Sequence, residues 1–291
     1  MKPPLFEYEA PETLDEALRL LAEHADEAKV LAGGQSLVPL LNFRLAKPGL
    51  LVDINRVRAL DYVRRSDGWL EIGAIARQRA VELDPTATQA CPLLTEALSY
   101  VGHFQIRNRG TVVGSLAHAD PAAELPAVAF ALGAELDVCG QRGRRSVPAS
   151  EFFLGYLTTA LQADELLVAV RFPARAPRTG YAFTEFARRH GDFALVGVAA
   201  VVELDEAGSR CTSLRLAYTG VGPRPVLFED PQGILRGQVP DPRVISVVAQ
   251  RAASLLEPDS DLHASGEYRR DLAGVLAERA LQMALSRGRG K

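Results

Sequence analysis

Two short glycine-bearing stretches carry the residues best suited to bind an anion. The first, Ala32–Leu37 (AGGQSL), follows a predicted strand and precedes a predicted helix. Paired glycines allow a tight turn and let backbone N–H groups approach a ligand. Ser36 adds a hydroxyl donor, and the N-terminus of the following helix favours negative charge. A pyrophosphate would suit this stretch, although a Gly-Gly turn by itself is more often only a turn.

The second stretch, Gly110–Glu124, combines hydroxyl donors with carboxylate acceptors. Thr111 and Ser115 flank Gly114, while Asp120 and Glu124 are acceptors suited to sugar or ribityl hydroxyls. A plainer interpretation is a loop that leads into a helix, with Asp120 as the N-cap and Pro121 at the first helical position. Both interpretations can hold at once.

Other chemistries have weaker support. His118, Asp120 and Glu124 are residue types that bind metals, but no second ligand cluster exists and the five histidines are scattered. The same scarcity, and the lack of GxSxG, disfavours a hydrolytic triad. Neither the P-loop pattern GxxxxGK[ST] nor the Rossmann pattern GxGxxG occurs. A dinucleotide would therefore bind through a different fold, and we predict no metal site.

Composition and charge narrow the class of protein. The 291 residues are 47% hydrophobic and carry a formal net charge of −3, without the basic bias of a nucleic-acid-binding protein. The three cysteines form no CxxC pair, which disfavours a zinc or iron–sulfur site and fits a reducing compartment. No apolar run reaches signal-peptide or membrane-span length. We expect a cytoplasmic protein without a membrane span.

The first stretch must be positioned by a small α/β lobe, about residues 1–55. Thr13 and Glu16 have capping-box spacing at the start of an amphipathic helix. The predicted elements are the strands Leu5–Tyr8, Ala28–Ala32 and Leu50–Ile54 and the helices Thr13–His24 and Leu37–Leu45.

A second lobe, about residues 56–175, must position the second stretch. Its predicted elements are the strands Trp69–Ile75, Ala134–Val138, Ser146–Pro148 and Leu166–Phe172 and the helices Arg77–Leu83 and Pro92–Val101. The proline-rich segment Pro173–Pro177 predicts a domain boundary. Beyond it, residues 178–291 contain three predicted strands, Tyr181–Ala187, Gly197–Leu204 and Ser213–Thr219. Short polar turns join these strands, which favours an antiparallel sheet. Two predicted helices follow, Val244–Leu256 and Glu267–Ala284.

Four segments together resemble the FAD-binding medium subunits of carbon monoxide dehydrogenase, xanthine dehydrogenase and related molybdenum hydroxylases. They are AGGQSLVPLLNFRL, VGHFQIRNRGTVVGSLAHADPAAELPAV, ARRHGDFALVGVAA and TGVGPRPV, in the family's order and across nearly the whole chain. The resemblance implies an α+β fold: a vanillyl-alcohol-oxidase-type FAD-binding domain of two α/β lobes (1–175), then an antiparallel sheet with a helical bundle (178–291).

The resemblance also implies roles for individual residues. Backbone contacts to the FAD diphosphate would come from Ala32, Gly33, Gly34, Gln35, Ser36 and Leu37. The facing stretch would contribute Thr111, Gly114 and Ser115, with Gly110 and Ala117 beside them. Asp120 and Glu124 would contact the ribose or the ribityl chain, Leu166 would pack near the adenine, and Gly102 matches a further contact position. No residue is implied as a catalytic acid or base.

Two positions depart from the family pattern. Val113 stands where the family has glycine, and a β-branched residue there would forbid positive φ and add bulk beside the phosphates. Thr184 stands where many relatives carry a lysine near the flavin. Without that lysine, either the redox potential of the flavin would shift or Arg188 or Arg189 would supply the positive charge.

The function implied by the resemblance is electron transfer. A large partner subunit would carry the molybdenum cofactor, and a small one two [2Fe–2S] clusters. Electrons would reach FAD on this chain and leave to NAD, a quinone or oxygen. Two alternatives remain open: a flavin-depleted scaffold or ligand-binding subunit, motivated by Val113 and Thr184, and a free-standing flavin oxidase or reductase.

Overall fold

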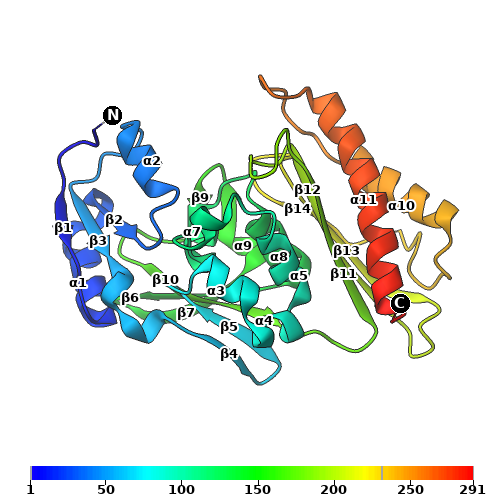
Figure 1. The fold of residues 1–291 in the computed structure, drawn as a ribbon, viewed down its shortest axis with the longest axis horizontal. Coiled ribbons are helices and arrows are strands. Elements are labelled where there is room, and N and C mark those ends of the chain that lie inside the picture. The colour runs from blue at the N-terminus through cyan, green and yellow to red at the C-terminus, as the bar shows by residue number, and fades with distance from the viewer. Residues whose placement is uncertain (1, 231, 291) are drawn as a thin grey trace.

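The N-terminal lobe is a small parallel sheet with one helix packed on it. The computed structural model describes residues 2–230 and 232–290 (Figure 1). Strands β1 (Glu7–Glu9), β3 (Leu50–Asp53) and β2 (Ala28–Leu31) pair side by side in that order, all parallel. Helix α1 (Leu14–His24) connects β1 to β2, and α2 (Leu37–Asn42) follows the glycine turn.

The start of α1 shows how local sequence determines this lobe. The Thr13 hydroxyl accepts a hydrogen bond from the Glu16 N–H at 3.2 Å, and the Glu16 carboxylate accepts one from the Thr13 N–H at 3.3 Å. This is the predicted capping box. Ala17, Leu18 and Leu21 then bury one face of α1 against the sheet. The packing of α1 therefore fixes the positions of β2 and the glycine turn that follow it.

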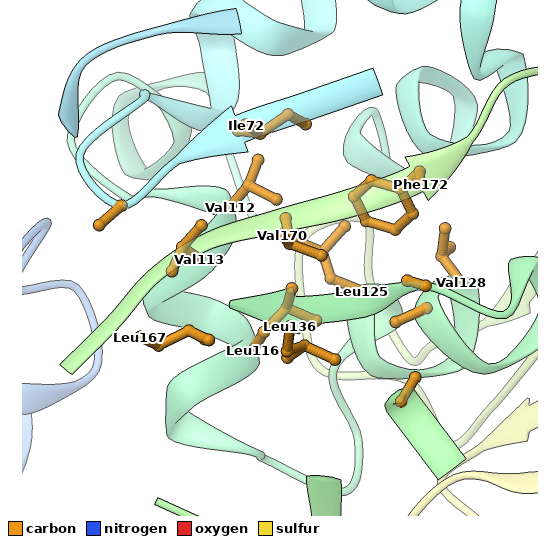
Figure 2. Close-up of a cluster of buried hydrophobic side chains, with 14 of the residues drawn as sticks. Ile72, Val112, Val113, Leu116, Leu125, Val128, Leu136, Leu167, Val170 and Phe172 are labelled. Carbon is orange, nitrogen blue, oxygen red and sulfur yellow. The ribbon is translucent and has the colours of Figure 1, made fainter. Parts of the chain in front are cut away.

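The second lobe is built on a five-stranded antiparallel sheet in the order β4-β5-β10-β6-β7. Its apolar face packs against α7 (Val112–His118) and α8 (Glu124–Leu132), as Figure 2 shows for Leu116, Leu125 and Val170. The remaining bounds are β4 (Val63–Ser66), β5 (Trp69–Gly73), β6 (Glu135–Gly140), β7 (Gly143–Pro148), β10 (Leu166–Pro173), α3 (Gln78–Leu83), α4 (Pro85–Ala90), α5 (Pro92–Leu98), α6 (Phe104–Arg107), α9 (Ala149–Phe152) and the hairpin β8 (Phe153–Gly155) with β9 (Thr158–Thr159).

The C-terminal part is an antiparallel sheet in the order β11-β12-β13-β14 with two helices on one face (Figure 1). Side chains alternate between the faces. Ala182 faces α10 and α11, whereas Tyr181 and Phe183 join the core shared with the second lobe. The bounds are β11 (Thr179–Phe186), β12 (Val196–Leu204), β13 (Cys211–Thr219), β14 (Val226–Phe228), α10 (Pro242–Ser254) and α11 (Gly266–Gly288).

The predicted α+β fold is confirmed, with element ends shifted by a few residues. The prediction of a loop across the second glycine-bearing stretch is wrong, because residues 112–118 form α7 with Thr111 as its N-cap. The prediction that Asp120 caps a helix is also wrong, since α8 begins at Glu124 after Ala123. The domain boundary at Pro173–Pro177 stays a prediction.

Candidate functional site

A cavity of about 790 Å³ opens between the N-terminal lobe, α7 and the loop that follows β11. This volume lies within the range usual for sites that bind small molecules and cofactors. All fifteen residues predicted to hold a cofactor line it: Ala32, Gly33, Gly34, Gln35, Ser36, Leu37, Gly102, Gly110, Thr111, Gly114, Ser115, Ala117, Asp120, Glu124 and Leu166. The fold thus brings the predicted set together, while its contact with a cofactor stays a prediction.

The two glycine-bearing stretches touch each other backbone to backbone. A Cβ atom added to Gly33 would lie 2.4 Å from the Arg109 carbonyl oxygen and 2.7 Å from the Gly110 Cα. Gly34 has a φ of +72°, which L side chains rarely adopt. Glycine is therefore required at Gly33 for space and at Gly34 for backbone conformation.

A hydrogen-bond relay behind the cavity holds the two stretches in register. The Asn55 amide donates to the Ala32 carbonyl at 2.8 Å. The Arg77 guanidinium donates to the Asn55 Oδ1 at 2.5 Å and to the Arg109 carbonyl at 2.6 Å. Burial, and then the charge of Arg109, lowers the pKa of Arg77, as expected for a cation held by neutral acceptors. Sequence reasoning missed this relay, because its members are separated by more than twenty residues.

Helix α7 forms the wall on the side of the second stretch. The Thr111 hydroxyl caps it by accepting from the Gly114 N–H at 3.0 Å. A Cβ on Gly114 would lie 2.5 Å from that hydroxyl oxygen. Gln78 lines the cavity beside Gly110, and its buried Oε1 has no hydrogen-bond partner among the described residues.

Val113 does not strain the backbone as predicted. It lies inside α7, where the backbone is helical, and it has no positive φ. Its side chain is 2% exposed and packs in the hydrophobic core beside Val112 (Figure 2). The predicted strain is therefore wrong, because this helical backbone accepts a β-branched residue. Val113 also lines the cavity, so the bulk that it would add beside the phosphates stays a prediction.

The acidic residues of the second stretch have distinct environments. Asp120 accepts from the Ala122 N–H at 2.8 Å and so shapes the turn between α7 and α8. Glu124 is 5% exposed, and burial raises its pKa to about 7. Burial lowers the pKa of His118. Across residues 2–230 and 232–290, no group of three or more His, Cys, Asp or Glu side chains is placed to hold a metal ion.

The two later segments reach the site from the C-terminal part. Gly191, Asp192 and Phe193 line the cavity. The Thr219 hydroxyl, at the end of β13, donates to the Pro121 carbonyl at 2.7 Å and lies 2.8 Å from the Ala123 carbonyl. This contact fixes the turn that leads into Glu124.

Thr184 is not at the cavity. Its hydroxyl donates to the Leu276 carbonyl at 3.2 Å, so it faces α11. The prediction that this position neighbours a flavin is wrong, because strand alternation turns Glu185 toward the second lobe instead. Arg188 is also not a substitute cation there, since it is exposed and donates to the His263 carbonyl at 3.2 Å. Neither Arg188 nor Arg189 lines the cavity.

Several lining residues were missed by sequence reasoning. Lys29 lies on β2, just before the first glycine-bearing stretch. Its closeness to that stretch in sequence was the one signal that could have identified it. Thr158, Thr159 and Gln162 come from the β8–β9 hairpin and the segment after it. No local pattern marks these residues, because only tertiary packing brings the hairpin to the cavity.

Known proteins resemble this chain over its full length. Residues 4–175 match the family model described as the FAD binding domain in molybdopterin dehydrogenase, and residues 181–284 match the CO dehydrogenase flavoprotein C-terminal domain. The 6-hydroxypseudooxynicotine dehydrogenase complex subunit alpha of Paenarthrobacter nicotinovorans is 43% identical over 289 residues, which is 99% of this chain and 97% of that protein.

Solved structures agree with the sequence comparison. Carbon monoxide dehydrogenase from Hydrogenophaga pseudoflava superposes with a TM-score of 0.95 at 37% identity, covering 99% of both chains. Quinoline 2-oxidoreductase from Pseudomonas putida 86 gives 0.94 at 39% identity, covering 99% of this chain and 100% of that one. The chain therefore belongs to the FAD-binding medium subunits of molybdenum hydroxylase-type oxidoreductases.

Proposed function

We propose that this chain carries electrons through FAD from the [2Fe–2S] clusters of a small partner subunit to an external acceptor. A large molybdopterin-binding partner would carry out the hydroxylation. The observation that supports the proposal most is the gathering of all fifteen predicted residues on one cavity. Its size and glycine-built cradle fit a dinucleotide cofactor.

Each side of the cavity has its own task in this proposal. The backbone from Ala32 to Leu37 faces Thr111, Gly114 and Ser115 across the diphosphate. Asp120 and Glu124 receive the ribose or ribityl hydroxyls, and Leu166 packs near the adenine. FAD, when bound, supplies the exchange between one-electron and two-electron carriers. The chain itself binds, orients and shields it.

The clusters and the molybdenum belong to partner chains in this proposal. Cys91, Cys139 and Cys211 are buried free thiols on separate elements, so they do not form a cluster ligand set. The relative from Paenarthrobacter nicotinovorans is named as a complex subunit, which supports a heteromeric assembly. A cytoplasmic location completes the proposal, supported by the unpaired thiols. No helix among the described residues is long and apolar enough to cross a membrane.

The test begins with the purified chain. We expect a yellow protein that releases about one FAD per chain, because the predicted residues gather on one cavity of cofactor size. Its flavin should be reduced by a cluster-bearing partner. A colourless protein that takes up no added FAD would refute the proposal in favour of a scaffold. Complete turnover of a reducing substrate and an acceptor by this chain without any partner would instead establish a free-standing flavin oxidoreductase.

A further inference from the structure

Two loops of the C-terminal part lead to the cavity wall, and their backbones touch each other. The first, residues 187–195, joins β11 to β12 and brings residues 191–193 to the cavity. The second is the turn that begins at Gly220, directly after β13. A Cβ on Gly220 would lie 2.4 Å from the Leu195 carbonyl oxygen, so no larger residue fits between the two loops.

Arg269, near the start of α11, bonds to both loops at this contact. Its Nη1 atom donates to the Leu195 carbonyl at 2.5 Å and to the Gly220 carbonyl at 3.1 Å. Its Nη2 atom donates to the Asp261 carboxylate at 2.8 Å. The Arg269 side chain is 8% exposed, so its charge lies away from water and depends on these three acceptors.

Asp261 holds the guanidinium in place. It lies in the connection between α10 and α11, and its other carboxylate oxygen accepts hydrogen bonds from the His263 and Ala264 N–H groups at 2.8 and 3.0 Å. These backbone donors fix the orientation of the carboxylate. Arg269 is therefore fixed at its backbone by α11 and at its guanidinium by Asp261.

The contact that Arg269 holds is connected to two parts of the cavity wall. Leu195 is two residues from Phe193, which lines the cavity. The Gly220 N–H donates to the Pro121 carbonyl at 2.8 Å, in the turn that leads into Glu124. A displacement of either loop at this contact would therefore move residues that line the cavity.

We propose that Arg269 is a positioning residue for the FAD cavity, because it holds the Leu195 and Gly220 carbonyls together and so sets the place of residues 191–193 and of the turn before Glu124. The inference rests on the proposed FAD-binding function. Arg269 does not line the cavity, so it acts on FAD only through these two backbones. Without this shared donor, the two carbonyl oxygens would move toward other donors or water.

The test is calorimetric titration of the full-length apoprotein with FAD, combined with visible circular dichroism of the bound flavin. In Arg269→Met we expect the Kd to rise about 10-fold and the flavin dichroism to change, because residues 191–193 lose their position. A role in stability alone would lower the melting temperature but leave both readings of the folded protein unchanged. Arg279→Met, which removes an exposed arginine from the same helix, is the control and should behave as wild type.

An unchanged Kd with unchanged flavin dichroism in folded Arg269→Met would overturn the inference. If Arg269→Met does not fold, Asp261→Asn decides in the same way, because the Asp261 side chain is 46% exposed and its replacement keeps the guanidinium. We expect the Kd of Asp261→Asn to rise about threefold, since the charged partner that orients Arg269 is lost. A Kd equal to that of wild type would then overturn the inference.

Amide hydrogen exchange of the apoprotein tests the same contact without FAD. In the folded variant, residues 189–195 and 219–223 should exchange about 10-fold faster than in wild type, relative to β10 in the second lobe. Equal exchange would also overturn the inference. A wild-type protein that binds no FAD, together with faster exchange of these residues in the variant, would contradict the proposed function but retain Arg269 as the residue that positions the cavity wall.

Discussion

Replacing Gly33 with alanine tests whether the contact between the two glycine-bearing stretches is needed to bind FAD. The new Cβ would lie 2.4 Å from the Arg109 carbonyl oxygen, 2.7 Å from the Gly110 Cα and 3.0 Å from the Thr111 nitrogen. All three are backbone atoms, which cannot rotate away as a side chain does. The stretches would have to move apart by about 1 Å to regain ordinary contact distances.

The size of the effect follows from what resists that movement. Overpacking of this kind costs about 1–3 kcal/mol. Separation also strains the bonds from Arg77 to the Arg109 carbonyl and from Asn55 to the Ala32 carbonyl, 2.6 and 2.8 Å long. We therefore expect a cost near the upper end, which raises the Kd for FAD by about 100-fold.

The assay is calorimetric titration of the apoprotein with FAD. Gly222→Ala is the matched control, because its Cβ would meet nothing closer than 3.8 Å and its backbone has no positive φ. The control should bind FAD within about twofold of wild type, as surface substitutions usually do. If Gly33→Ala also binds within that limit, the contact between the stretches does not determine the site and the reasoning is refuted.

Three further predictions concern the surroundings of the cavity. Arg77→Met removes the donors to Asn55 and to the Arg109 carbonyl. We expect FAD affinity to fall by about 10-fold or more with an unchanged circular dichroism spectrum, because hydrogen bonds from a charged donor contribute about 1.5–3 kcal/mol. Unchanged FAD affinity would show that these hydrogen bonds are dispensable. Thr219→Val removes the hydroxyl that donates to the Pro121 carbonyl and lies beside the Ala123 carbonyl. Urea unfolding should show a loss of about 1–3 kcal/mol, and an unchanged midpoint would contradict the anchoring of this turn. The third prediction concerns pH. The pKa values of Glu124 and Glu185 are raised from 4.5 to about 7 and about 8, so the folded apoprotein binds more protons than the unfolded chain above pH 4.5. The free energy of unfolding should therefore fall as the pH rises through this window, by about 3 kcal/mol from the fully buried Glu124 alone. The fall should be smaller in Glu185→Gln, and a flat profile in the wild type would contradict the raised pKa values.

Local signals predicted the first lobe well. The capping box at Thr13 and Glu16, the spacing of buried residues in α1 and the glycine turn each depend on neighbours in the chain. Such features form wherever the sequence places them. The predicted strand and helix order was therefore confirmed there with small changes at the ends.

The second stretch was predicted less well for a physical reason. Valine, glycine and serine are weak helix formers, so residues 112–118 carry little helical signal. Burial of Val112, Val113 and Leu116 against β10 stabilises α7 instead. The same burial explains why Val113 replaces glycine without strain.

The orientation of Thr184 could not be derived from sequence. Strand β11 is buried on both faces through most of its length, so it lacks the alternation of apolar and polar residues that reveals which side faces the core. Only the packing of α11 on one face and the second lobe on the other assigns Thr184 to α11 and Glu185 to the interface.

The sequence by itself determined the family, the α+β fold and the set of residues that meets at the cavity, because these depend on short motifs and their order. The tertiary structure decided how that set is held together. Asn55 and Arg77 join the two stretches, Thr219 fixes the turn before Glu124, and Glu185 faces the interface. These contacts join residues far apart in the chain, and no periodicity or motif encodes such pairings before the chain has packed.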